Sequence, residues 1–179
     1  MTDPAENQTI LETPRLTIQT WTTDDLRPAF ELFSDAGIMR YIGNGKPFTL
    51  DATGKFLIWV QKYQAENGFC RWKVIERSSG EIIGSCGLAR PEGLAEVELG
   101  YIMRRASWGK GFATEAAKAC MHYGFNNLGF REIIALTDPE NTASRRVLEK
   151  IGFHNTGLKM HKDEDTSIYK AVAPGNIYE

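Results

Sequence analysis

The residues most suggestive of chemistry lie in a glycine-rich turn that follows a strand-like run. Residues 96–101 alternate acidic or small residues with apolar ones, and Trp108-Gly109-Lys110-Gly111 then leads into an alanine-rich helix. The first N–H groups of a helix lack intrahelical acceptors and carry the positive end of the helix dipole, so such a turn can bind a pyrophosphate. Glycines there also permit a tight turn and close helix packing, and geometry alone gives both interpretations similar weight.

Two familiar nucleotide-binding motifs do not fit this turn. Gly109 and Gly111 resemble the opening of G-x-G-x-x-G, but the third position of that motif is Thr114. The turn also follows an antiparallel run near the middle of the chain rather than the first strand of a βαβ unit. The pattern G-x-x-x-x-G-K-[ST] does not occur in the sequence, which argues against ATP hydrolysis.

The spacing of cysteines and histidines argues against a disulfide framework and a metal centre. The cysteines are odd in number, widely separated and form no C-x-x-C pair: Cys70, Cys86 and Cys120. The histidines are equally scattered: His122, His154 and His161. We therefore expect buried thiols and no bound metal.

The composition fits one globular domain over residues 1–179, with a core of about 9–173. The chain has 179 residues, 42% of them hydrophobic and 25% charged, and a net charge of -2, which argues against a nucleic-acid or anionic-membrane partner. Its longest apolar stretch, residues 56–60, is far shorter than the roughly 20 residues of a membrane-spanning helix. Residues 1–8 lack the basic start and apolar middle of a secretory signal, so a cytoplasmic location is expected.

Hydrophobic periodicity predicts a mixture of strands and helices. Strands are predicted where apolar and polar residues alternate or apolar residues cluster: residues 10–21, 69–76, 82–89, 95–104, 133–137, 153–160 and 167–172. Helices are predicted where apolar residues recur every three or four positions: residues 26–35 with Gly37 as the stop, about 56–67, 109–126, and 141–151 with Asn141 as the N-cap. The short loop at Ser78-Ser79-Gly80 favours antiparallel pairing, so strands 69–76, 82–89 and 95–104 should form a meander.

With these segments in this order, the sequence resembles the GCN5-related N-acetyltransferase (GNAT) superfamily, especially its RimJ/RimL-type branch. The resemblance covers nearly the whole chain and is carried by Thr13-Pro14-Arg15-Leu16, Met39-Arg40-Tyr41-Ile42, Gly84-Ser85-Cys86-Gly87-Leu88, Glu98-Leu99-Gly100-Tyr101, Trp108-Gly109-Lys110-Gly111-Phe112-Ala113-Thr114-Glu115-Ala116, Asn141-Thr142-Ala143-Ser144 and Val147-Leu148-Glu149-Lys150-Ile151-Gly152-Phe153. The superfamily signature Q/R-x-x-G-x-G/A is matched at Gly111 and Ala113, but its first position is Trp108.

The resemblance implies an α/β fold whose central, mostly antiparallel sheet is flanked by helices and splays open at an acetyl-coenzyme A (acetyl-CoA) cleft. The pantetheine amides would bond along a strand edge, the pyrophosphate would lie on the turn, and Arg104 and Arg105 would add positive charge. The implied binding residues are Tyr101, Ile102, Met103, Arg104, Trp108, Gly109, Lys110, Gly111, Phe112, Ala113, Thr114, Asn141 and Ser144, with no metal.

The implied reaction is acyl transfer to a primary amine by direct attack on the thioester. Glu98 would take the proton of the amine through a water, and Glu96, two residues away on the same face, is the next candidate. A backbone N–H near Ile102 or Met103 would polarise the thioester carbonyl. Ser144 would protonate the departing thiolate, at a place where many other branches have a tyrosine.

The sequence leaves the acceptor open. An α-amino group, with a pKa of roughly 7.7–8.0, asks less of a base than a lysine amine at roughly 10.4. A protein N-terminus and a small-molecule amine, such as an amino acid, polyamine or drug, are both candidate substrates for a monomer or homodimer. A non-catalytic acyl-CoA-binding sensor is the alternative from another class, because it needs the phosphate turn but neither base nor acid.

Overall fold

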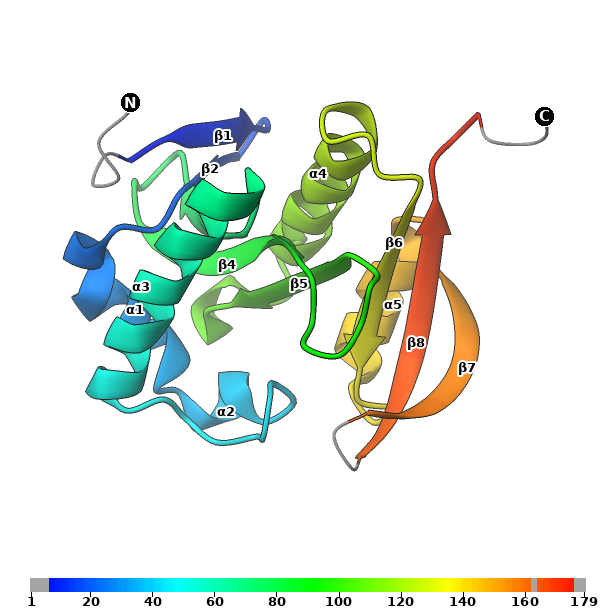
Figure 1. The fold of residues 1–179 in the computed structure, drawn as a ribbon. Helices are drawn as coiled ribbons and strands as arrows, with labels where there is room; N and C mark the ends of the chain where they lie inside the picture. Colours follow the sequence, from blue (N-terminus) through cyan, green and yellow to red (C-terminus); the bar gives the residue numbers. More distant parts are fainter. Residues whose placement is uncertain (1–6, 162–163, 176–179) are drawn as a thin grey trace.

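One mixed sheet organises the computed structural model, which describes residues 7–161 and 164–175. In these residues the sheet has eight strands in the order β1-β2-β3-β4-β5-β6-β8-β7, and helices cover both of its faces (Figure 1). The strands are β1 (Thr9–Glu12), β2 (Leu16–Gln19), β3 (Arg71–Glu76), β4 (Ile82–Ala89), β5 (Glu98–Met103), β6 (Glu132–Thr137), β7 (His154–His161) and β8 (Glu164–Val172). The α-helices are α1 (Leu26–Phe33), α2 (Ala36–Met39), α3 (Leu50–Asn67), α4 (Phe112–Asn126) and α5 (Thr142–Lys150).

Strand pairing confirms the predicted α/β fold class and the meander. Neighbouring strands are antiparallel from β1 to β5, and so are the pairs β6–β8 and β7–β8. The pair β5–β6 is parallel. No helix in the described part of the chain is long and apolar enough to cross a bilayer.

Two local predictions in the N-terminal part are wrong. Residues 10–21 form not one strand but the hairpin β1–β2, whose turn is closed by the N–H of Thr13 donating to the carbonyl of Leu16 at 2.9 Å. Pro14, in the turn, has no N–H for a continuous ladder. Gly37 is not the stop of the first helix either. That helix ends at Phe33, and Asp35 caps α2 by accepting the N–H of Gly37 at 2.8 Å.

The two faces of the sheet carry separate cores. Side chains of a strand alternate between faces, so Leu99, Tyr101 and Met103 of β5 face α4, whereas Glu98 and Ile102 face the side covered by α1 and α3. Helix α4 presents a stripe of small buried residues to the sheet: Ala116, Ala117, Cys120 and Gly124. The alternation along β5 therefore decides which side chains can meet on each face.

Strands β5 and β6 separate almost as soon as they meet. Across the described residues, Glu98 opposite Ile134 is the single register pair between them, and the N–H of Ile134 donates to the carbonyl of Val97 at 2.9 Å. Beyond this point β6, β8 and β7 turn away from β3, β4 and β5 (Figure 1). The edge of β5 that faces β6 is thus left without a strand partner from Leu99 onward, which is the splayed sheet that the resemblance implies.

Candidate active site

The glycine-rich turn leaves the start of α4 uncapped. After a 3-10 turn, Arg105–Ser107, the chain passes through Gly109 and Gly111, whose φ values of 73° and 81° lie in the left-handed region that favours glycine. The N–H of Glu115 donates to the carbonyl of Gly111 at 3.0 Å, so the N–H groups of residues 112–114 precede the first intrahelical bond. Within the described residues no side chain caps this helix. The helix start therefore offers free donors and a positive dipole end to an anion.

A brace from the β1–β2 turn holds the first turn of α4 in place. The carboxylate of Glu115 accepts hydrogen bonds from the hydroxyl of Thr13 at 2.6 Å and from the backbone N–H and Nε of Arg15 at 3.0 and 2.6 Å. The guanidinium of Arg15 also donates to the carbonyl of Lys110 at 2.9 Å and lies 4.5 Å from the ring centre of Phe112. Partial burial raises the pKa of Glu115, but the hydrogen bonds from Thr13 and Arg15 outweigh it and hold the pKa below its ordinary value.

The sequence reasoning missed this brace, although Thr13, Arg15 and Glu115 all lie in segments that carry the resemblance. The brace ties the turn to a distant hairpin and adds a guanidinium beside the helix start. Of the predicted cationic residues, Lys110 lies in the turn and is exposed.

The structure pairs Arg104 and Arg105 with carboxylates on α1 and just before α2. Nη2 of Arg104 lies 3.1 Å from Oε2 of Glu31 on α1. The guanidinium of Arg105 binds both oxygens of Asp35, with Nε–Oδ2 and Nη2–Oδ1 distances of 2.9 and 2.7 Å. These contacts, together with the N–H groups that Asp35 caps, hold the pKa of Asp35 below its ordinary value. Both arginines are therefore engaged with α1 and α2.

The open edge of β5 has backbone groups that an extended amide can bind. Backbone groups alternate between the two sides of a strand, and the N–H of Arg104 donates to the carbonyl of Ile83 in β4 at 2.7 Å. The backbone N–H and C=O of Ile102 consequently point toward β4. Those of Tyr101 and Met103 point toward β6. The indole of Trp108 donates to the carbonyl of Met103 at 2.8 Å. The N–H of Met103, rather than that of Ile102, is thus on the open side.

The side chain of Tyr101 meets Ser144 across the α4 side of this edge. Its hydroxyl lies 2.9 Å from Oγ of Ser144 and donates to the carbonyl of Ser144 at 3.0 Å. The predicted cap is present too, because Oδ1 of Asn141 accepts the N–H of Ser144 at 3.1 Å. Burial raises the pKa of the Tyr101 phenol well above its ordinary value, more than the hydrogen bond with Ser144 lowers it. The sequence reasoning assigned only the backbone of Tyr101, although strand alternation would have pointed its side chain toward the helices.

Glu98 lies on the opposite face, in an ion pair that the sequence reasoning did not identify. Its Oε2 is 2.7 Å from Nη2 of Arg71, and the two side chains are 18% and 17% exposed. Glu96 does not share this face of the strand as predicted, because β5 begins at Glu98 and Glu96 lies exposed in the preceding bend. A carboxylate and a tyrosine–serine pair therefore lie on opposite faces of the same strand.

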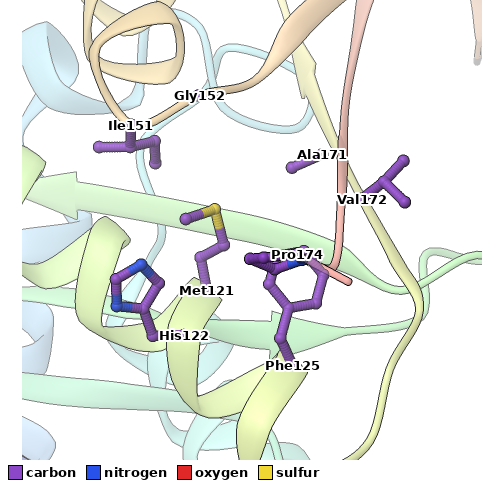
Figure 2. Close-up of a pocket in the computed structure, with 8 residues that line it drawn as sticks. All are labelled: Met121, His122, Phe125, Ile151, Gly152, Ala171, Val172 and Pro174. Carbon is purple, nitrogen blue, oxygen red and sulfur yellow. The ribbon is translucent and has the colours of Figure 1, made fainter. Parts of the chain in front are cut away.

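A separate apolar cavity lies at the other end of α4. Figure 2 shows the residues that line this cavity, which come from the C-terminal half of α4, the end of α5 and the end of β8. Its volume is about 260 Å³. It is lined by Met121, His122, Phe125, Ile151, Gly152, Ala171, Val172 and Pro174. At a rise of 1.5 Å per residue, Phe125 is about 20 Å along the helix from Phe112. The cavity is thus remote from the uncapped helix start.

Comparison with known proteins identifies the family. A family model of the acetyltransferase (GNAT) domain matches residues 15–154. The uncharacterized protein YkkB of Bacillus subtilis (strain 168) is 37% identical over 166 residues, covering 91% of this chain and 95% of that protein. The uncharacterized N-acetyltransferase p20 of Bacillus licheniformis is 34% identical over 152 residues, covering 83% of this chain and 84% of that protein. Spermidine N(1)-acetyltransferase of Escherichia coli (strain K12) is 29% identical over 149 residues, covering 78% and 73%.

Solved structures show the same fold. The GNAT-family acetyltransferase of Bacillus anthracis superposes with a TM-score of 0.78 at 30% identity, covering 90% of this chain and 97% of that one. RimL, a ribosomal L7/L12 alpha-N-protein acetyltransferase solved in complex with coenzyme A, superposes with a TM-score of 0.80, covering 93% and 98%. Its 14% identity supports likeness of fold alone. The chain therefore belongs to the GNAT acetyltransferase family and is an acetyl-CoA-dependent N-acetyltransferase.

Proposed function

We propose that this enzyme acetylates a primary amine by direct attack on acetyl-CoA, and that its acceptor is the N-terminal amine of a protein. The observation that carries the proposal is the placement of Glu98 and of the Tyr101–Ser144 pair on opposite faces of the open edge of β5. The amine and the thioester would meet between β5 and β6. Glu98 would then act on the amine from one face, and the Tyr101–Ser144 pair would act on the thioester sulfur from the other. An α-amino group suits a carboxylate base, because its pKa is only roughly 7.7–8.0.

The chain offers a fitting site for acetyl-CoA. The uncapped N–H groups of residues 112–114, the turn glycines and Lys110 would hold the pyrophosphate. The N–H and C=O of Tyr101 would bind a pantetheine amide as an added strand, which leaves the N–H of Met103 for the thioester. Trp108 and Asn141 support this edge by fixing the carbonyl of Met103 and the start of α5. Arg104 is the predicted binding residue that this geometry supports least, because it is engaged with Glu31.

The chemistry follows from these positions. Acetyl-CoA supplies an activated acyl group, so the enzyme must deprotonate the amine, polarise the carbonyl and protonate the thiolate. Glu98 takes the proton of the amine through a water, and the N–H of Met103 donates to the carbonyl oxygen. As the C–N bond forms and the C–S bond breaks, Ser144 gives its proton to sulfur and receives one from Tyr101, whose hydroxyl turns from the carbonyl of Ser144 to its Oγ. Solvent water then returns a proton to the phenolate of Tyr101. The high pKa of Tyr101 keeps its phenol protonated at neutral pH.

Removing either member of the Tyr101–Ser144 pair should lower kcat about tenfold. Ser144→Ala removes the proton donor, and Tyr101→Phe removes the group that replenishes it. The effect is modest because a thiol of roughly pKa 8.5 leaves as a thiolate of ordinary basicity that water can protonate. The double variant should be no slower than either single variant, since both act on one proton path. Steady-state release of coenzyme A gives kcat for all three variants.

A tyrosine on α4 provides the control for this pair. Tyr123 lies on α4, and its ring packs against Trp72. Tyr123→Phe removes only its hydroxyl. Its kcat should equal that of the wild type. If Tyr101→Phe and Ser144→Ala also retain full kcat, the thiolate is protonated by solvent and the proposed acid is wrong.

A small-molecule amine is the second candidate acceptor, and the likeness to spermidine N(1)-acetyltransferase supports it. The deciding experiment compares kcat/KM for peptides with free N-termini, the same peptides acetylated at the N-terminus, amino acids and spermidine. We expect the free peptides to react fastest and the blocked peptides not at all. Faster reaction of spermidine or an amino acid would favour a small-molecule acetyltransferase. Tight binding of acetyl-CoA without turnover of any amine would favour a sensor.

A further inference from the structure

The side chain of Arg71 lies across two neighbouring strands to reach Glu98. In the register of the sheet, Arg71 of β3 is opposite Gly87 of β4, and Gly87 is opposite Gly100 of β5. A Cβ atom at Gly100 would collide with the guanidinium of Arg71. Because Gly100 has no side chain, the side chain of Arg71 can lie directly on the sheet above it.

Both terminal nitrogens of the Arg71 guanidinium form hydrogen bonds. Nη1 of Arg71 donates to the carbonyl of Gly87 at 3.0 Å, and Nη2 binds Oε2 of Glu98 at 2.7 Å. A guanidinium is planar, so its two hydrogen bonds define its orientation and, through it, the orientation of the Glu98 carboxylate. Of the two carboxylate oxygens of Glu98, Oε2 has a hydrogen-bond partner among residues 7–161 and 164–175 and Oε1 has none. Oε1 is left for a water or an amine.

Stability alone is a weak reason for this arrangement. The paired side chains are only 17% and 18% exposed, and removing two charges from water costs about as much free energy as their attraction returns. An apolar pair of similar volume would stabilise the sheet at least as well. The pair lies where β5 and β6 begin to separate, beside the edge at which acyl transfer is proposed.

We infer that Arg71 is a positioning residue that fixes the Glu98 carboxylate at the opening between β5 and β6, with one oxygen directed to the acceptor amine. This inference rests on the proposed role of Glu98 as the base. Arg71 does not itself exchange a proton, because a guanidinium remains charged throughout the physiological range. It acts on the rate through the orientation of Glu98.

The first test replaces the arginine. Arg71→Met keeps the length of the apolar stem and should lower kcat about 10- to 100-fold, with the dissociation constant of coenzyme A within twofold of wild type. Arg71→Lys should retain an intermediate kcat, because an ammonium can pair with Glu98 but cannot form the fork. In Arg71→Ala, added ethylguanidine should restore part of the lost kcat, whereas sodium chloride at equal ionic strength should not.

The second test displaces the arginine without removing it. Gly100→Ala places a methyl group where the guanidinium lies and should lower kcat to the range of Arg71→Met. Gly54→Ala in α3 is the matched control, because the nearest atom to its added Cβ, Cδ1 of Leu26, is 3.9 Å away. The control should retain wild-type kcat. Thermal unfolding of every variant identifies any that do not fold, and kcat is compared only among the folded ones.

A double variant separates positioning from a purely structural contact. If Arg71 acts through Glu98, then Arg71→Met should change kcat less than about twofold in a Glu98→Gln background. Equal losses of kcat in both backgrounds, or wild-type kcat in both Arg71→Met and Gly100→Ala, would overturn the inference. Failure of the proposed function looks different: Glu98→Gln alone would keep the wild-type kcat if Glu98 is not the base, and the wild-type enzyme would prefer a small-molecule amine, or turn over no amine, if the acceptor is not a protein N-terminus.

Discussion

Replacing Glu98 with glutamine is expected to lower kcat about 10²- to 10⁴-fold while the affinity for coenzyme A stays nearly unchanged. The change preserves the shape of the side chain and its hydrogen bond to Arg71, but it removes the oxygen that accepts a proton. Glu98 lies on the face of β5 opposite Tyr101 and the helices that follow the turn, so the substitution touches none of the proposed phosphate donors. Steady-state kinetics and calorimetric binding of coenzyme A measure the two quantities separately.

The pH dependence of this variant provides a further check. An amine that is already neutral needs no base, so raising the pH toward the pKa of the acceptor should partly restore kcat/KM in Glu98→Gln. Glu96→Gln is the control, because Glu96 is exposed in the bend before β5 and should behave as wild type. An unaltered rate and pH profile in Glu98→Gln would show that the carboxylate is structural. The amine would then arrive neutral or use another base.

Replacing Gly111 with valine should weaken the binding of coenzyme A about 10- to 100-fold. Gly111 immediately precedes α4 with φ at 81°, and the N–H groups that follow it are the proposed pyrophosphate donors. Loss of even one charge-assisted hydrogen bond costs about 1.5–3 kcal/mol, which corresponds to this loss of affinity. The Cβ of a residue here would also lie 3.4 Å from Nη2 of Arg15, so the larger valine side chain would disturb the brace.

Backbone strain caused by Gly111→Val must be distinguished from loss of the coenzyme A site. A residue with a Cβ in the left-handed region costs about 1–2 kcal/mol wherever it occurs. Gly129, with φ at 72° and no atom within 4 Å of an added Cβ, provides a matched control in the loop between α4 and β6. Gly129→Val should unfold at a temperature similar to Gly111→Val and bind coenzyme A as wild type does. Equal affinity in the two variants, measured by calorimetry, would remove the turn from the binding site.

Features set by local periodicity were predictable from the sequence. Alternation along residues 95–104 assigned Glu98 and Tyr101 to opposite faces of a strand, and the meander followed from the short loop at residues 78–80 together with this third alternating run. The stripe of small residues on α4 and the cap at Asn141 depend on neighbours within one or two helical turns. The same local reasoning failed at residues 10–21, where the turn around Pro14 interrupts a pattern that otherwise alternates like one strand.

The chemistry of the site, by contrast, depends on contacts between distant residues. Arg71 and Glu98 are 27 residues apart, Tyr101 and Ser144 are 43 apart, and Arg15 and Glu115 are 100 apart. Each pair forms because the sheet register or the docking of a helix brings two strands or turns together. Periodicity assigns a side chain to a face but does not say which other segment lies beside it.

The sequence by itself determined the family resemblance, the glycine-rich turn before α4 and the face on which Glu98 lies. Only the tertiary structure decided what Glu98 and Tyr101 touch. It also showed that Arg104 and Arg105 are engaged by α1 and α2, and that β5 and β6 separate after one pair. The physical reason is that strand register and helix docking are set by burial of both faces of the sheet together, which is a property of the whole core and not of any segment.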